Sequence, residues 1–179
     1  MAIFPPEDRL WWKQPLHWQE LTWLAVCLVW ALTMFFTMIV WHSIGDQNLS
    51  NEAYQISPDK FAERTEAMVE KYQVREEGDS GIPVVRPPAE SEVYMLARTY
   101  QWWPVLELEK GKSYRLHLSS MDLQHGFSLQ PTNINVQVHP GYELVMTVTP
   151  NETGEFGVIC NEFCGIGHHT MVGRIHVVE

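Results

Sequence analysis

The stretch CNEFCGIGHHTM, residues 160–171, places two thiols, an imidazole and a thioether within twelve residues. Soft sulfur ligands together with imidazole suit copper, and a cysteine–histidine–methionine set is the ligand chemistry of electron-transfer copper sites. A mononuclear blue-copper site needs one cysteine, whereas Cys160 and Cys164, four residues apart, can bridge two metal ions. The segment therefore predicts a copper site.

Zinc and a disulfide are the competing interpretations of these two cysteines. Methionine is a poor zinc ligand, and structural zinc sites favour closely spaced cysteines with a partner pair elsewhere in the chain. A disulfide between Cys160 and Cys164 would leave the neighbouring histidine and methionine without a use. The third cysteine, Cys27, lies alone in an apolar stretch and is expected to act as a small hydrophobe.

The residues around this stretch have the period of β-strands. Polar and apolar residues alternate, and prolines and glycines separate the runs at short intervals. The alternating runs are Tyr114–Leu118, Ile134–Val138, Leu144–Val148 and Arg174–Val178. From Glu92 onward the chain is therefore expected to be mainly β, a sandwich or barrel of about 90 residues. The cysteines follow an expected strand, Glu155–Ile159, and thus lie in a loop at one end.

A further imidazole is needed if this loop is to saturate two metal ions. His125 is the candidate, because it follows a strand expected to end near Ser119 and could lie at the same end of the sandwich. An isolated histidine in that place is more often structural. His125 is predicted to be a ligand because the cysteine loop is expected at the same end of the sandwich.

A transmembrane helix is predicted near the N-terminus. Residues 21–41 contain no charge, and as a helix they would span about 31 Å, which matches the core of a bilayer. A cleaved signal peptide would have a shorter apolar core and a small-residue cleavage site, which residues 42–46 do not provide. Arg9 and Lys13 precede the helix and no basic residue follows before Lys60, so residues 1–20 are expected in the cytoplasm and the rest outside.

Residues 42–91 are expected to connect the helix to the β domain, residues 92–179. Within the connector, 58–74 has the pattern of a short amphipathic helix, and 76–90, rich in proline, glycine and charge, is expected to be an extended linker. The formal net charge of the chain is -10, which argues against nucleic acid as a partner and favours a basic protein.

Two patterns in the β domain resemble the binuclear copper (CuA) motif of cytochrome c oxidase subunit II. They are Asp122-x-x-His125 and Cys160-x-Glu162-x-Cys164-Gly165-x-x-His168-x-x-Met171. The resemblance extends over 132–135 and 140–141 and covers 92–179, and a single N-terminal helix fits the short versions of that subunit. It implies a cupredoxin-like Greek-key β-sandwich or barrel with one N-terminal transmembrane helix.

The resemblance also implies a ligand set for two copper ions. Both cysteine thiolates would bridge the ions, His125 and Met171 would complete one ion, and His168 and the backbone carbonyl of Glu162 would complete the other. Bridging thiolates would let the two metals share one unpaired electron, which reduces the change of geometry on oxidation and reduction.

Three further residues receive weaker assignments. Asp122 is expected to orient His125, although turn formation explains an aspartate there equally well. Trp102 or Trp103 corresponds to the aromatic region where electrons enter in the family; packing in the sandwich or a belt facing the membrane is the alternative.

The function that the resemblance implies is that of the electron-accepting subunit of a membrane haem–copper terminal oxidase. It would take electrons from cytochrome c on the outer face of a bacterial or archaeal cell membrane and pass them to haem in catalytic subunit I, which reduces oxygen to water. This chain would transfer electrons only, and haem would lie only in the partner. Three alternatives stay open: the same subunit in a nitric oxide reductase, a membrane-tethered carrier with one copper, and a copper chaperone or sensor.

Overall fold

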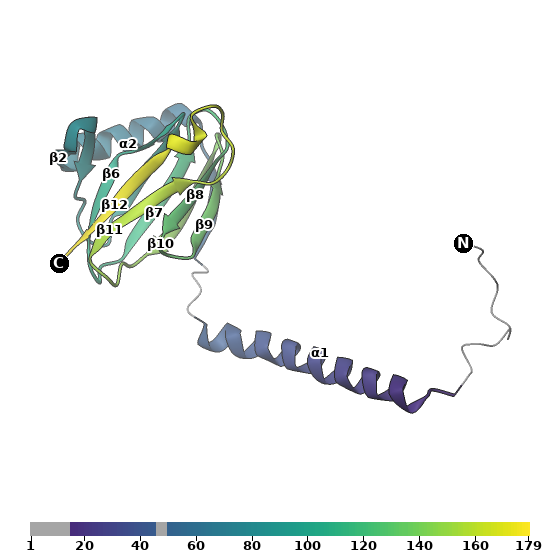
Figure 1. Ribbon diagram of the computed structural model, residues 1–179. Coiled ribbons are helices and arrows are strands. Elements are labelled where there is room, and N and C mark those ends of the chain that lie inside the picture. Colours follow the sequence, from purple (N-terminus) through teal and green to yellow (C-terminus); the bar gives the residue numbers. More distant parts are fainter. Residues whose placement is uncertain (1–14, 46–49) are drawn as a thin grey trace, which may run out of the picture. The chain divides into compact units, whose positions relative to one another are not determined.

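The computed structural model describes residues 15–45 and 50–179 of the chain (Figure 1). It divides the chain into two compact units, Met1–Gln47 and Asn48–Glu179, and each is considered by itself. The expected cytoplasmic segment, including Arg9 and Lys13, lies mostly outside the described residues.

The first unit consists of helix α1, Trp18–Ile44, which contains the whole predicted span 21–41. Among the described residues it is the one helix long and apolar enough to cross a membrane. Its three threonine hydroxyl groups, those of Thr22, Thr33 and Thr37, each donate to the backbone carbonyl four residues earlier. Because these hydroxyl groups are satisfied within the helix, the threonines can face hydrocarbon without exposing an unpaired donor.

The second unit is a sandwich of two sheets that do not close into a barrel. The order in the first sheet is β1 (Glu52–Gln55), β10 (Tyr142–Val148), β7 (Tyr114–Ser120), β4 (Glu92–Arg98) and β5 (Gln101–Trp103). The order in the second is β2 (Gln73–Glu77), β3 (Ile82–Val85), β6 (Val105–Glu109), β12 (Val172–Val178), β11 (Gly154–Cys160), β8 (His125–Gln130) and β9 (Ile134–Val138). The prediction of a mainly β fold is confirmed, and every alternating run named above lies in a strand.

The core lies between the two sheets and follows the period of two. Met95, Leu116 and Leu118 point into it from the first sheet, and Phe127 and Val158 point into it from the second. Most neighbouring strands are antiparallel, but β4 and β7, β6 and β12, and β3 and β6 run parallel. Strands from distant parts of the sequence thus share one core, which gives the ends of the sandwich a rigid base.

The structure agrees only in part with the connector predicted for residues 42–91. Helix α2, Pro58–Tyr72, agrees with the expected helix within two residues and packs its buried face against β4. Residues 76–90, however, are no free linker, because they include the end of β2, the short 3-10 helix η2 (Gly78–Ser80) and β3. Val84 and Val85 are fully buried and pair with β6. The proline and glycine content suggested a linker, although this segment includes the short apolar strand β3, which pairs with β6 later in the chain.

A buried carboxylate ties this region to the sandwich. Glu107 on β6 is almost completely buried and forms ion pairs with Arg75 on β2 and with Arg86, directly after β3. A buried charge requires partners of opposite sign, so β2 and the end of β3 are held against the second sheet.

Phe61 on α2 tests whether the connector belongs to the folded unit. Its side chain is fully buried and meets the ring of Tyr94 edge to face at 5.7 Å. We expect Phe61→Ala to lower the unfolding free energy of fragment 50–179 by about 3–5 kcal/mol, measured by chemical denaturation. The neighbouring exposed Lys60→Ala should change it by no more than about 0.5 kcal/mol. Equal values for the two variants would mean that α2 is dispensable.

Candidate metal centre

Three segments that are distant in sequence meet at one end of the sandwich. His125 is the first residue of β8, Cys160 is the last residue of β11, and Met171 directly precedes β12. The loop between β11 and β12, which contains the 3-10 helix η3 (His168–Thr170), lies at this end (Figure 1). Because β11 pairs with both β8 and β12, the ends of these strands bring the predicted ligands together.

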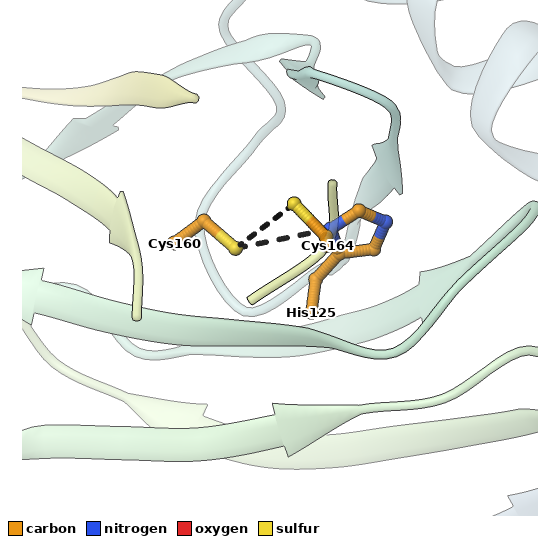
Figure 2. A group of neighbouring side chains, drawn as sticks. All are labelled: His125, Cys160 and Cys164. Carbon is orange, nitrogen blue, oxygen red and sulfur yellow. Dashed lines mark hydrogen bonds between the residues drawn. The ribbon is translucent and has the colours of Figure 1, made fainter. Parts of the chain in front are cut away.

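The sulfur of Cys160 lies at the centre of one group of donor atoms. Its Sγ is 3.8 Å from Cys164 Sγ, 3.8 Å from His125 Nδ1 and 3.3 Å from the carbonyl oxygen of Glu162. Figure 2 shows both thiols and the His125 ring directed toward one another. The two cysteines are free, since a disulfide would require a sulfur separation of about 2.05 Å. The disulfide interpretation is therefore not supported.

The sulfur of Cys164 completes the arrangement. Its Sγ is 3.6 Å from His168 Nδ1 and 3.9 Å from Met171 Sδ. The other four predicted ligand atoms thus lie around the pair of cysteine sulfurs. His125, both cysteines and Met171 are buried, whereas His168 is partly exposed. His169, which was left out of the predicted site, is exposed.

The donor set fits a soft cation such as copper. Burial, followed by the hydrogen bond and charge of the neighbouring Cys160 thiol, raises the pKa of Cys164 to about 11. Two adjacent thiolates are therefore unfavourable without a cation between them. A metal ion that binds here must displace protons from the thiols, and the thiolate, imidazole and thioether donors then available are those that copper prefers.

Asp122 fixes the ring of His125. Its Oδ1 lies 2.9 Å from His125 Nε2, and its other oxygen accepts hydrogen bonds from the backbone N–H and the hydroxyl of Thr99. Burial alone would raise the pKa of Asp122, but these hydrogen bonds outweigh it and hold the pKa well below its ordinary value. With Nε2 donating to the carboxylate, Nδ1 presents its lone pair to the thiols. Asp122 also accepts the N–H of Leu123, so its turn contacts and its contact with His125 are both present.

The two tryptophans lie in different environments. Trp102 is only 1% exposed, and its ring meets those of His125 and Phe127 edge to face. It packs beneath the site, so a donor protein could not touch it directly. Trp103 is partly exposed, and the guanidinium group of Arg98 lies 5.7 Å from its ring centre.

Two further aromatic residues lie nearer the surface, and neither was among the predicted site residues. Tyr100 lies against the backbone of Gly165 and Gly167, where an added Cβ would overlap its hydroxyl group and its ring respectively. Phe163 meets the ring of His168 at a centroid distance of 5.9 Å and is largely exposed. An aromatic residue between the two cysteines was the available signal for Phe163, whereas the position of Tyr100 depends on packing between segments far apart in sequence.

A close backbone contact holds the cysteine loop against β8. A side chain at Gly126 would overlap Asn161, whose backbone N–H donates to the Gly126 carbonyl at 3.3 Å. An added Cβ at Gly126 would require the Asn161 side chain to move, and that side chain donates to Asn135 Oδ1 at 3.1 Å.

Gly126→Ala should therefore displace the Asn161 side chain and cost about 1–3 kcal/mol of stability, measured by thermal unfolding of fragment 50–179. Gly157→Ala on β11 is the matched control, because an added Cβ there meets no atom within 4 Å. We expect the control to shift stability by less than about 1 kcal/mol. A stable Gly126 variant would show that the loop can move without loss.

Known proteins are similar to this chain over most of its length. No protein-family model matches it. One cytochrome c oxidase subunit 2 of Thermus thermophilus is 33% identical over 165 residues, covering 89% of this chain and 92% of the relative. A second cytochrome c oxidase subunit 2 from Thermus thermophilus is 37% identical over 116 residues, covering 62% and 86% respectively.

A solved structure has a similar fold. A chain of a haem–copper terminal oxidase dimer, determined by cryo-electron microscopy, superposes with a TM-score of 0.56 at 26% identity. The superposition covers 89% of this chain and 99% of that chain, and the implied cupredoxin-like sandwich with one N-terminal helix is confirmed. The paired thiols, their histidine and methionine neighbours and these similarities lead to one conclusion: the chain belongs to the cytochrome c oxidase subunit 2 family.

Proposed function

We propose that this chain is the electron-accepting subunit of a membrane haem–copper terminal oxidase. It receives electrons from a c-type cytochrome at a binuclear copper (CuA) centre and passes them to haem in the catalytic subunit, where oxygen is reduced to water. The observation that carries this proposal is the pair of buried free thiols, Cys160 and Cys164, whose sulfurs lie 3.8 Å apart among nitrogen, oxygen and thioether donors.

The ligand assignment is the one that the resemblance to the family implies, and the gathering of the donors around the two sulfurs supports it. Both cysteine thiolates would bridge two copper ions, His125 and Met171 would hold one ion, and His168 and the Glu162 carbonyl would hold the other. When bound, the two ions supply a one-electron relay. The side chains of His125 and Met171 are buried and exclude water, and the hydrogen bond from His125 to Asp122 limits rotation of the ring. A carrier with a single copper would need only one of the two thiols, which meet in one cluster.

The membrane arrangement is part of the proposal. Helix α1 spans a bacterial or archaeal cell membrane once, with residues 1–20 in the cytoplasm and the copper domain on the outer face. This orientation rests on Arg9 and Lys13 in the sequence. Functionally, 42–91 joins the span to the copper domain 92–179, and its strands and α2 stabilise that domain.

Turnover of the purified complex tests the proposed reaction. With a reduced c-type cytochrome as donor, we expect oxygen consumption that depends on copper in this subunit. Reduction of nitric oxide without reduction of oxygen would instead assign the subunit to a nitric oxide reductase, whose substrate is chosen at the haem site of another polypeptide.

Copper analysis tests the centre itself. Fragment 50–179, which contains every strand of the described residues, should bind two copper ions per chain and show a delocalised mixed-valence spectrum. Cys160→Ser and Cys164→Ser should each abolish that spectrum, because each variant removes a bridging thiolate. His169→Ala, an exposed neighbour, is the control and should leave it unchanged. One copper per chain, zinc in its place, or ready loss of copper on dialysis would contradict the assignment.

Substitution of Asp122 tests its role as a positioning residue. Asp122→Asn retains size but removes the charge that holds His125, so copper affinity should fall about 10- to 100-fold in competition with a chelator. The copper spectrum should shift at the same time, which a purely structural role would not cause. Asp79→Asn, in exposed η2, is the control. An unchanged copper affinity would mean that Asp122 only stabilises the turn and does not position His125.

A further inference from the structure

Two polar side chains on the outer side of β9 reach the cysteine loop. Strand β9 pairs antiparallel with β8, and in this register Gln137 lies opposite Gly126. Asn135 and Gln137 are exposed, whereas Val138 is buried in the core. Because side chains alternate along a strand, Asn135 and Gln137 lie on the face of the sheet that points away from the core. We call these two residues the β9 clamp.

The β9 clamp binds the two residues that directly follow Cys160. Nδ2 of Asn161 donates to Oδ1 of Asn135 at 3.1 Å. Nε2 of Gln137 donates to Oε1 of Glu162 at 2.8 Å. Two consecutive residues of the loop are thus hydrogen-bonded to alternate residues of one strand.

The side chain of Glu162 runs across β8 to reach the clamp. An added Cβ at Gly126 would come within 3.0 Å of Glu162 Cγ, so the stem of Glu162 lies over the position where Gly126 has no side chain. The carboxylate ends at Gln137, the residue paired with Gly126. Among the described residues Gln137 is the one hydrogen-bond donor to this carboxylate, and the direction of the Glu162 side chain depends on it.

The backbone of Glu162 is where these contacts meet the proposed copper centre. Its carbonyl oxygen lies 3.3 Å from Cys160 Sγ and is a proposed ligand. A backbone carbonyl has no side-chain torsion with which to reach a metal, so its direction is set by the path of the loop. The β9 clamp restricts that path at Asn161 and Glu162. Weak ligands and the contacts that orient them tune copper–thiolate sites.

We propose that Asn135 and Gln137 are positioning residues of the copper centre, which hold the loop after Cys160 so that the Glu162 carbonyl faces the cysteine sulfurs. This inference rests on the proposed function and adds to it two residues that touch no metal. Strand β9 carries none of the proposed ligands and contributes to the centre through these side-chain contacts.

The test uses the purified full-length chain loaded with copper. Gln137→Met and Asn135→Ala each remove one bond of the clamp, so copper affinity in competition with a chelator should fall about tenfold and the copper absorption bands should shift. Gln130→Met and Asn133→Ala are the matched controls and should change neither. Gln130 is exposed and donates to Ser128 on its own strand, and Asn133 is exposed in the turn before β9.

An exchange of the two bonded side chains tests the contact itself. Gln137→Glu alone sets two carboxylates against each other and should also weaken copper binding. Adding Glu162→Gln restores an amide–carboxylate hydrogen bond in the opposite direction. The double variant should therefore regain the copper spectrum and, within about twofold, the copper affinity of the wild type.

Thermal unfolding of the copper-free chain separates positioning from stability. Because both clamp residues are exposed, Gln137→Met and Asn135→Ala should unfold at nearly the wild-type temperature. Wild-type affinity and spectrum in both variants, a loss of affinity matched by a loss of copper-free stability, or an exchange that fails to restore binding would overturn the inference while the proposed function stands. A wild-type chain that binds one copper ion or none would instead refute the proposed function.

Discussion

The end of the sandwich that carries the proposed copper site depends on two buried thiols, those of Cys160 and Cys164, placed side by side. Cys160, Cys164 and Met171 belong to the same hydrophobic cluster as Phe127 and Val158, so the sandwich core and the proposed metal pocket are one packed unit. Close packing leaves these side chains little room to move. A redox metal held in this way would change its geometry little between oxidation states, which is the physical requirement for rapid electron transfer.

The two sheets contribute differently to this centre. The second sheet supplies the donors from the ends of β8 and β11 and from the residue before β12. The first sheet supplies support: Trp102 on β5 packs against His125, and Thr99, between β4 and β5, binds the carboxylate that holds the same ring. The orientation of His125 thus depends on the packing of both sheets. Substitutions in the core should therefore also disturb the position of the His125 ring.

Burial divides the loop between β11 and β12 into an inner and an outer side. Most donor atoms lie inside the protein, while Phe163 and Ile166 lie at the surface of the same loop. Gly165 and Gly167 permit this division, because they let the chain turn over Tyr100 without side chains of their own. One short segment can therefore hold metal on its inner side and present an apolar surface on its outer side.

Periodicity and local spacing determined a large part of this protein. The uncharged run predicts α1, alternation predicts β7, β9 and β10, and the Cys/His/Met loop indicates copper, because these signals depend on neighbours within a few residues. Only the tertiary structure decided that β2 and β3 join the second sheet, that Asp122 binds His125 and Thr99 together, and that Trp102 is buried while Phe163 is not. These features depend on contacts between residues distant in sequence, whose burial and pairing are set by how the two sheets pack.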